Sequence, residues 1–163
     1  MNEPQSETGP RTSEIKPRLT PIDNGTVLDH LPVGSALKII QLLGLDPTSG
    51  AVTVAINTES SKRGRKDLLF IENMELAGSD LEKIGLLASG ATWNTIVNKI
   101  VAKKQVISLP ETCHDIIKCP NPSCITNAEK IPTCFSISED ALSGTCYYCE
   151  RTLEKKELLK CLK

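Results

Sequence analysis

The chain has 163 residues, enough for one ordinary domain or two small ones, and 39% of them are hydrophobic but only 3% aromatic. A modest core of Ile, Leu and Val side chains is therefore expected. The 19 basic and 20 acidic residues leave a formal net charge of -1, which argues against a dedicated binder of duplex DNA or another polyanion. No apolar run approaches the roughly 18 residues that a membrane-spanning helix needs.

The N-terminal segment, residues 1–19, is polar and contains three prolines. It offers too little apolar surface to offset the entropy of ordering, so we expect a disordered tail, with docking on a partner as the alternative. The segment also lacks the apolar centre of a secretion signal. We therefore expect a cytoplasmic protein, in which disulfide bonds are rare.

From residue 25 onward, β-branched runs alternate with helix-compatible spacings of apolar residues. The expected elements are, in chain order, a strand at 25–31, a helix at 36–43 that ends at Gly44, strands at 51–56 and 66–74 on either side of a polar loop at 57–65, a helix at 79–89, and two strands within 92–107. Ser79 and Glu82 have the spacing of a capping box that would open the second helix.

This order of elements is typical of the split βαβ, ferredoxin-like fold. It predicts an α+β architecture: a ferredoxin-like α/β sandwich, whose antiparallel sheet carries both helices on one face, followed by a small all-β zinc-binding domain. The regular pattern stops at Ser108-Leu-Pro-Glu-Thr112, because Pro110 cannot continue a central strand. We therefore expect a domain boundary near residues 108–114.

All seven cysteines lie in the C-terminal third of the chain, between Cys113 and Cys161. Four of them form two close pairs, Cys119 with Cys124 and Cys146 with Cys149, which about twenty residues separate. Two tight turns that each present two sulfurs predict one tetrahedral Zn²⁺ site, closed by four thiolates and therefore structural. Buried thiols or disulfides are the alternatives. Cys113, Cys134 and Cys161 are expected to remain outside the site as small, partly buried side chains.

Catalytic constellations are not recognisable in the sequence. Asp29 and His30 are adjacent in a strand, so we expect them to point to opposite faces and not to interact. The basic stretch at 62–66 is expected to be a solvated turn. The residues alone therefore predict a two-domain binding protein with a structural zinc and no enzymatic activity.

A zinc-ribbon adaptor that binds protein or nucleic acid is the alternative function. Nucleic-acid binding is disfavoured because the zinc-binding region has few cations. Between residues 115 and 150, only Lys118 and Lys130 stand against Asp115, Glu129, Glu139, Asp140 and Glu150. A hydrolase with a catalytic zinc is disfavoured because four thiolates leave no open coordination position.

Six short motifs follow one another along residues 20–150 in an order that resembles the regulatory chain family of aspartate carbamoyltransferase. The motifs are Gly25-Thr-Val-Leu-Asp-His30, Gly64-Arg-Lys-Asp67 with Ile71-Glu-Asn73, Ala91-Thr92 with Asn94 and Ile96, Ser108-Leu-Pro-Glu111, Cys119-Pro-Asn-Pro-Ser-Cys-Ile125, and Cys146-Tyr-Tyr-Cys-Glu150. The resemblance implies a non-catalytic regulatory subunit in pyrimidine biosynthesis.

The resemblance also implies partners. An allosteric domain at 20–108 would bind CTP or ATP and pair with a second regulatory chain, and a zinc-binding domain at 114–163 would contact the catalytic chain. The implied assembly is two catalytic trimers joined by three regulatory dimers, without nucleic acid or membrane.

Nucleotide-binding residues carry over from the family unevenly. The resemblance places the nucleotide against Ile22, Asp29, His30, Asn94 and Lys104. Two family cations are absent, because Phe70 and Val106 occupy their positions, and Lys103 is expected to replace them only in part. Nucleotide binding is therefore expected to be weakened or lost.

Overall fold

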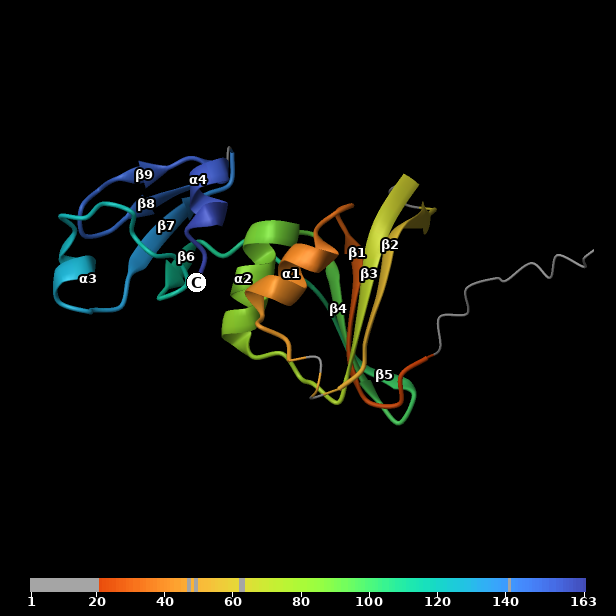
Figure 1. The fold of residues 1–163 in the computed structure, drawn as a ribbon. Helices are drawn as coiled ribbons and strands as arrows, with labels where there is room; N and C mark the ends of the chain where they lie inside the picture. The colour runs from red at the N-terminus through yellow and green to blue at the C-terminus, as the bar shows by residue number, and fades with distance from the viewer. Residues whose placement is uncertain (1–20, 47, 49, 62–63, 141) are drawn as a thin grey trace, which may run out of the picture.

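The structure is a computed structural model that describes residues 21–163 except 47, 49, 62, 63 and 141. The tail expected at 1–19 lies outside the described residues. Two antiparallel sheets lie one after the other along the chain, with a short connection after the first sheet (Figure 1). Among the described residues, no helix is long and apolar enough to cross a membrane.

The first sheet has five strands within the described residues, in the order β2-β3-β1-β4-β5, and every pairing is antiparallel. Helices α1 and α2 both cover the same face of this sheet (Figure 1). This arrangement confirms the predicted ferredoxin-like sandwich. The elements are β1 (Gly25–Leu31), α1 (Ala36–Leu42), β2 (Val52–Ser60), β3 (Gly64–Glu72), α2 (Gly78–Ala88), β4 (Thr92–Val97) and β5 (Ile100–Val106).

The core of the sandwich lies between the sheet and the helices. Leu28 pairs in register with Leu69 on one side and with Trp93 on the other, and all three are buried in one cluster with Ile39 and Ile84 of the helices. Burial of each such side chain contributes about 1.5–3 kcal/mol. Because side chains alternate along a strand, the residues next to these three face the opposite, outer side of the sheet.

The hairpin between β2 and β3 is longer than the sequence predicts. Pairing continues to Ser60 and Gly64, through residues that were expected to form a loop. Their side chains are polar because this end of the hairpin is largely exposed, and polar side chains do not prevent backbone pairing. The prediction of a loop at 57–65 is therefore wrong at both ends.

The start of α2 also differs from the prediction. The helix begins at Gly78, and the Asp80 side chain accepts a hydrogen bond from the Ala77 N–H at 3.0 Å. The expected capping box of Ser79 and Glu82 is therefore wrong by two residues. Asp80 stands at the third helical position, where a carboxylate reaches the N–H that precedes the helix.

The second sheet has the strand order β6-β7-β8-β9 within the described residues, and Phe135, Leu153 and Leu158 in its core are fully buried. Leu86 of α2 belongs to the same core, so the two halves of the chain are packed together. The small β domain is confirmed, with two short helices in addition. The elements are β6 (Thr112–His114), α3 (Ile125–Ala128), β7 (Cys134–Ser138), β8 (Ser143–Cys146), β9 (Thr152–Leu153) and α4 (Lys155–Lys160).

Candidate functional site

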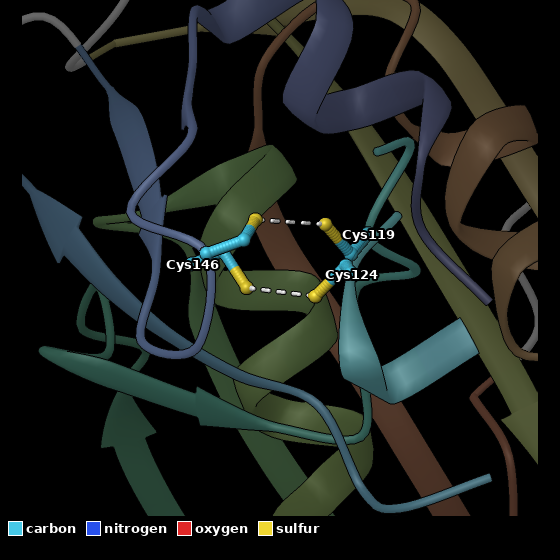
Figure 2. Close-up of side chains that lie close together, drawn as sticks. Cys119, Cys124 and Cys146 are labelled. Carbon is cyan, nitrogen blue, oxygen red and sulfur yellow. Dashed lines mark hydrogen bonds between the residues drawn. The ribbon is translucent and has the colours of Figure 1, made fainter. Parts of the chain in front are cut away.

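The four paired cysteines meet at one end of the second sheet. Cys119 and Cys124 lie in the segment between β6 and α3, Cys146 ends β8, and Cys149 follows in the turn before β9. Their Sγ atoms all lie within 4.8 Å of one another. Figure 2 shows Cys119, Cys124 and Cys146 with their sulfurs pointing toward a common centre.

The sulfur geometry fits a tetrahedral zinc ion. The Sγ atoms of Cys119 and Cys149 are 3.6 Å apart, and those of Cys124 and Cys146 are 3.9 Å apart. A Zn–S bond of about 2.3 Å gives a tetrahedron with edges of about 3.8 Å, whereas a disulfide would bring two sulfurs to about 2.05 Å. All seven cysteines are free thiols, which excludes the disulfide alternative in this structure. The remaining three lie outside the cluster, as expected.

Two polar side chains after Cys124 support the cluster. Thr126 donates a hydrogen bond from Oγ1 to the Cys124 sulfur at 3.2 Å. The Asn127 amide donates to the backbone carbonyls of Cys119 and Asn121, at 2.9 and 2.8 Å, and so closes the first cysteine turn. Neither residue could be identified from the sequence, because their role depends on the turn that brings them back toward the first cysteine of the pair.

The thiols of the cluster differ in acidity. Burial raises the pKa of Cys119 to about 12 and also raises the pKa of Cys146. Burial acts in the same direction on Cys149, but hydrogen bonds from the Arg151 backbone, Asn121 and Cys119 outweigh it and lower the pKa of Cys149 to about 6. In the metal-free protein near neutral pH, Cys119 and Cys146 therefore hold protons that a metal must displace.

We expect zinc affinity to rise with pH. The raised pKa values of Cys119 and Cys146 mean that binding releases their protons, so acid competes with the metal. Each proton released corresponds to about a tenfold gain in apparent affinity per pH unit. Calorimetry in two buffers with different ionisation enthalpies measures the number of protons released. A zinc affinity that is equal at pH 6 and pH 8 would contradict this prediction.

A β-bulge near the end of β1 brings Asp29 and His30 together. The register of β1 shifts between Leu28 and Leu31, and His30 has a φ of 60°. The Asp29 carboxylate accepts a hydrogen bond from the His30 N–H at 2.5 Å and lies 3.4 Å from the His30 Nδ1. The expectation that these side chains point apart is therefore wrong, because the alternation of side chains holds only for a regular strand.

Lys66 joins this pair, although the sequence interpretation placed it in a solvated turn. Its ammonium group lies 2.6 Å from the Asp29 carboxylate, and both side chains are largely buried. That interpretation is wrong for Lys66; Lys62 and Arg63 lie outside the described residues. Lys66 lies in β3 next to Asp67, which pairs with Leu31 directly after the bulge of β1, and this cross-strand neighbour is not visible in the sequence.

The other nucleotide-binding candidates lie along β1 and β4. Asn94 donates to the Val27 carbonyl at 3.3 Å and pairs in register with Lys104 on β5. Val27, Asn94 and Lys104 thus form a row across three strands. The Thr92 hydroxyl, two residues before Asn94, lies 3.5 Å from the His30 Nδ1 and so connects this row to the bulge of β1. Ile22 is buried just before β1, at the opposite end of that strand from His30.

The two positions at which a family cation is missing differ in their exposure to solvent. Phe70 is half-buried and pairs in register with Val27, whereas Val106 is exposed near the end of β5. Lys103 does not replace the missing cations. Its ammonium group lies 4.6 Å from the centre of the Trp93 ring, and Trp93 belongs to the core under the helices. The predicted partial substitution by Lys103 is therefore wrong, because neighbouring strand residues face opposite sides.

Comparison with known proteins places both halves of the chain. Residues 18–108 match the family model of the aspartate carbamoyltransferase regulatory chain, allosteric domain, and residues 111–159 match that of its metal binding domain. The second match confirms the prediction of a metal-binding module, and the four cysteines fit zinc.

Individual relatives cover nearly the whole chain. The aspartate carbamoyltransferase regulatory chain of Pyrococcus horikoshii is 44% identical over 145 residues, which are 87% of this chain and 95% of the relative. That of Methanopyrus kandleri is 45% identical over 140 residues, which are 84% and 90% of the two chains. The resemblance seen in the sequence is thus confirmed. The chain belongs to the family of aspartate carbamoyltransferase regulatory chains, non-catalytic subunits with an allosteric and a metal-binding domain.

Proposed function

We propose that this regulatory chain binds a nucleoside triphosphate, CTP or ATP, on residues 20–108 and grips the catalytic chain through residues 114–163. The assembly would consist of two catalytic trimers joined by three regulatory dimers and would act in pyrimidine biosynthesis. Seven free thiols suit a reducing compartment, which supports the cytoplasm as its location. Cys119, Cys124, Cys146 and Cys149 are the zinc ligands in this proposal.

The grouping of Asp29, His30 and Lys66 at the β1 bulge is the observation that carries the nucleotide proposal. A carboxylate suits the hydroxyl groups of a ribose, and an imidazole beside an ammonium group suits phosphate oxygens. Without a bound anion, the ammonium group of Lys66 is held by Asp29 at 2.6 Å. Asp29 therefore keeps the Lys66 cation in place until a phosphate competes for it.

Lys104 would supply the second cation for the phosphates. It stands across β4 from the Val27 backbone, with Asn94 between them, so a nucleotide can lie along this row on the outer face of the sheet. Phe70 lies on the same row, on the other side of Val27. A lysine at that position would add positive charge to the row, and its absence is expected to lower the affinity for a triphosphate.

Removing a positive charge from this row should weaken nucleotide binding, and adding one should strengthen it. Lys104→Ala should weaken ATP and CTP binding about 10-fold to 100-fold and reduce its salt dependence, because a charge-assisted hydrogen bond contributes about 1.5–3 kcal/mol. Phe70→Lys should tighten binding about tenfold. Calorimetry on the purified regulatory chain measures both effects.

Lys38→Ala is the matched control, since it removes the same charge from the exposed side of α1, on the helix-covered face of the first sheet. It should leave the affinity within about twofold of the wild-type value. If millimolar ATP and CTP produce neither heat nor a shift in melting temperature with the wild-type chain, the nucleotide proposal fails, and the proposed assembly role stands alone.

Exposed aromatic side chains next to the cysteines support the proposed grip on the catalytic chain. Tyr147, which directly follows Cys146, is 76% exposed, and its ring meets that of Tyr148 edge to face at 5.6 Å. Ile125, which directly follows Cys124, is 44% exposed. Large apolar and aromatic side chains at the surface are typical of protein interfaces. Co-purification with a catalytic trimer in stoichiometric amounts tests this role.

An exposed aromatic pair beside the zinc is also one of the two features that a zinc-ribbon adaptor for nucleic acid would need. The other feature, a basic surface, is not supported by the composition of residues 115–150. Family membership favours a protein partner for this surface.

A further inference from the structure

Two β-bulges flank β3 at the same level. In β1, Asp29 and His30 stand where the register passes from the Leu28–Leu69 pair to the Leu31–Asp67 pair. In β2, Ile56 and Asn57 stand where the register passes from the Ala55–Leu68 pair to the Thr58–Lys66 pair. A bulge leaves one strand with an extra residue whose backbone groups are unpaired by the ladder, so each bulge needs another source of hydrogen bonds.

Both bulges contain a residue with left-handed backbone geometry. His30 has a φ of 60° and Asn57 a φ of 57°. Outside glycine this conformation is uncommon, although Asn, Asp and His adopt it more often than other side chains. It persists where surrounding contacts hold it. The geometry that places His30 beside Asp29 therefore depends on contacts outside these two residues.

Asp67 supplies such contacts from the strand between the bulges. Its side chain is fully buried, and its Oδ1 accepts a hydrogen bond from the Asn57 N–H at 2.9 Å. Its Oδ2 accepts from the Gly34 N–H at 2.8 Å and the Ala36 N–H at 3.3 Å, in the segment that leads from β1 into α1. One buried carboxylate thus ties the β2 bulge to the segment that follows the β1 bulge.

The two residues before Asp67 contact the same bulges. Arg65 donates to the backbone carbonyl of Asn57 at 2.6 Å and to its side-chain oxygen. Lys66 holds the Asp29 carboxylate, which in turn accepts from the His30 N–H. Three consecutive residues of β3 therefore fix the bulges on both sides, and Asp67 is the one of the three that is fully buried.

We propose that Asp67 is a positioning residue of the nucleotide site: without touching the ligand, its carboxylate fixes the β2 bulge and the segment that follows the β1 bulge, and so holds the backbone that places Asp29, His30 and Lys66. This inference rests on the proposed nucleotide function for its ligand, but the geometry it describes belongs to the chain itself. It assigns a role to the aspartate of the Arg-Lys-Asp sequence that charge alone would not suggest, because Asp67 is buried beneath the site.

Asp67→Asn in the full chain tests the proposal. The amide has the same shape but only one accepting oxygen, so either the Asn57 side or the Gly34 side loses its acceptor. ATP and CTP affinity by calorimetry should fall at least tenfold. In hydrogen exchange, the His30 and Asn57 amides should lose protection, while amides in the middle of β4 keep theirs.

Thr26→Val is the matched control. Thr26 is also fully buried in β1, and its hydroxyl donates to the Met74 carbonyl at 2.8 Å, at the far end of the strand from His30. Its loss should lower the melting temperature without changing nucleotide affinity by more than about twofold or the protection of His30. Equal losses of nucleotide affinity in both variants would show that Asp67 only stabilises the fold in general, and would overturn the proposal.

The exchange measurement separates this inference from the nucleotide function. If the wild-type chain binds neither ATP nor CTP, the nucleotide function fails, and the position of Asp29 and His30 is judged from exchange alone. Unchanged protection of His30 in Asp67→Asn overturns the positioning role whether or not nucleotide binds.

Discussion

Cys149→Ala should abolish tight zinc binding and unfold the metal-binding domain, while the allosteric domain keeps its structure. The zinc-binding half of the chain is too small to be stabilised by its core alone, and a structural zinc contributes about 10–16 kcal/mol in comparable small modules. Removing one of the four ligands leaves three thiols around a site that no longer closes. We expect the same result for Cys119, Cys124 and Cys146, whose sulfurs lie in the same cluster.

The single tryptophan makes this result directly visible. Trp93 is buried in the core of the first sheet, so its fluorescence reports on the allosteric domain alone. In Cys149→Ala, metal analysis should find no zinc and Trp93 emission should stay near its native wavelength, while hydrogen exchange in β7 and β8 becomes fast.

Cys161→Ala is the matched control, since Cys161 is a half-buried thiol outside the cluster, and it should retain one zinc per chain. A Cys149→Ala chain with a fully protected second sheet would show that the metal does not hold this domain.

Removal of zinc from the proposed assembly should separate it into catalytic trimers and regulatory dimers. The reason is structural: the proposed contact surface, with Tyr147 and Ile125, is built on the turns that the four cysteines hold. A mercurial captures thiolates and so removes the ligands of the metal. Cys149 should react first, because it is half-buried whereas the other three ligands are buried.

Size-exclusion chromatography with zinc analysis measures this dissociation. Addition of excess thiol and Zn²⁺ should restore the original assembly, which distinguishes loss of the fold-holding metal from irreversible damage. An assembly that survives complete loss of zinc would show that the catalytic chain is bound by another surface of the regulatory chain.

The parts of this protein that could be predicted from its sequence are those in which spacing alone carries the information. The order of strands and helices follows from periodic patterns, since a buried face must repeat every two or about 3.6 residues. The cysteine cluster follows from two close pairs, because a tight turn brings its two sulfurs together in any fold. Neither inference requires knowledge of distant contacts.

The wrong predictions for β1 and β3 concern residues whose conformation is set by a contact with a distant part of the sequence, where the local rule of side-chain alternation does not hold. Asp29 and His30 were expected on opposite faces, yet a bulge, held by contacts from β3, brings them to one side. Lys66 pairs with Asp29, which lies 37 positions earlier in the chain, and the local pattern of residues 62–66 does not reveal this partner. At the start of α2, Asp80 takes the place predicted for Glu82, because the helix begins at Gly78, earlier than the spacing of Ser79 and Glu82 predicts.

The position of Leu86 links the stability of the two domains. This residue of α2 is 2% exposed within the core of the second sheet, while Ile84 and Ala88 of the same helix are buried against the first. Unfolding of the second domain would return a leucine side chain to water, a change of about 1.5–3 kcal/mol. The melting temperature of the allosteric domain thus contains a contribution from the metal, and conversely any ligand that stabilises α2 raises the free energy needed to release zinc.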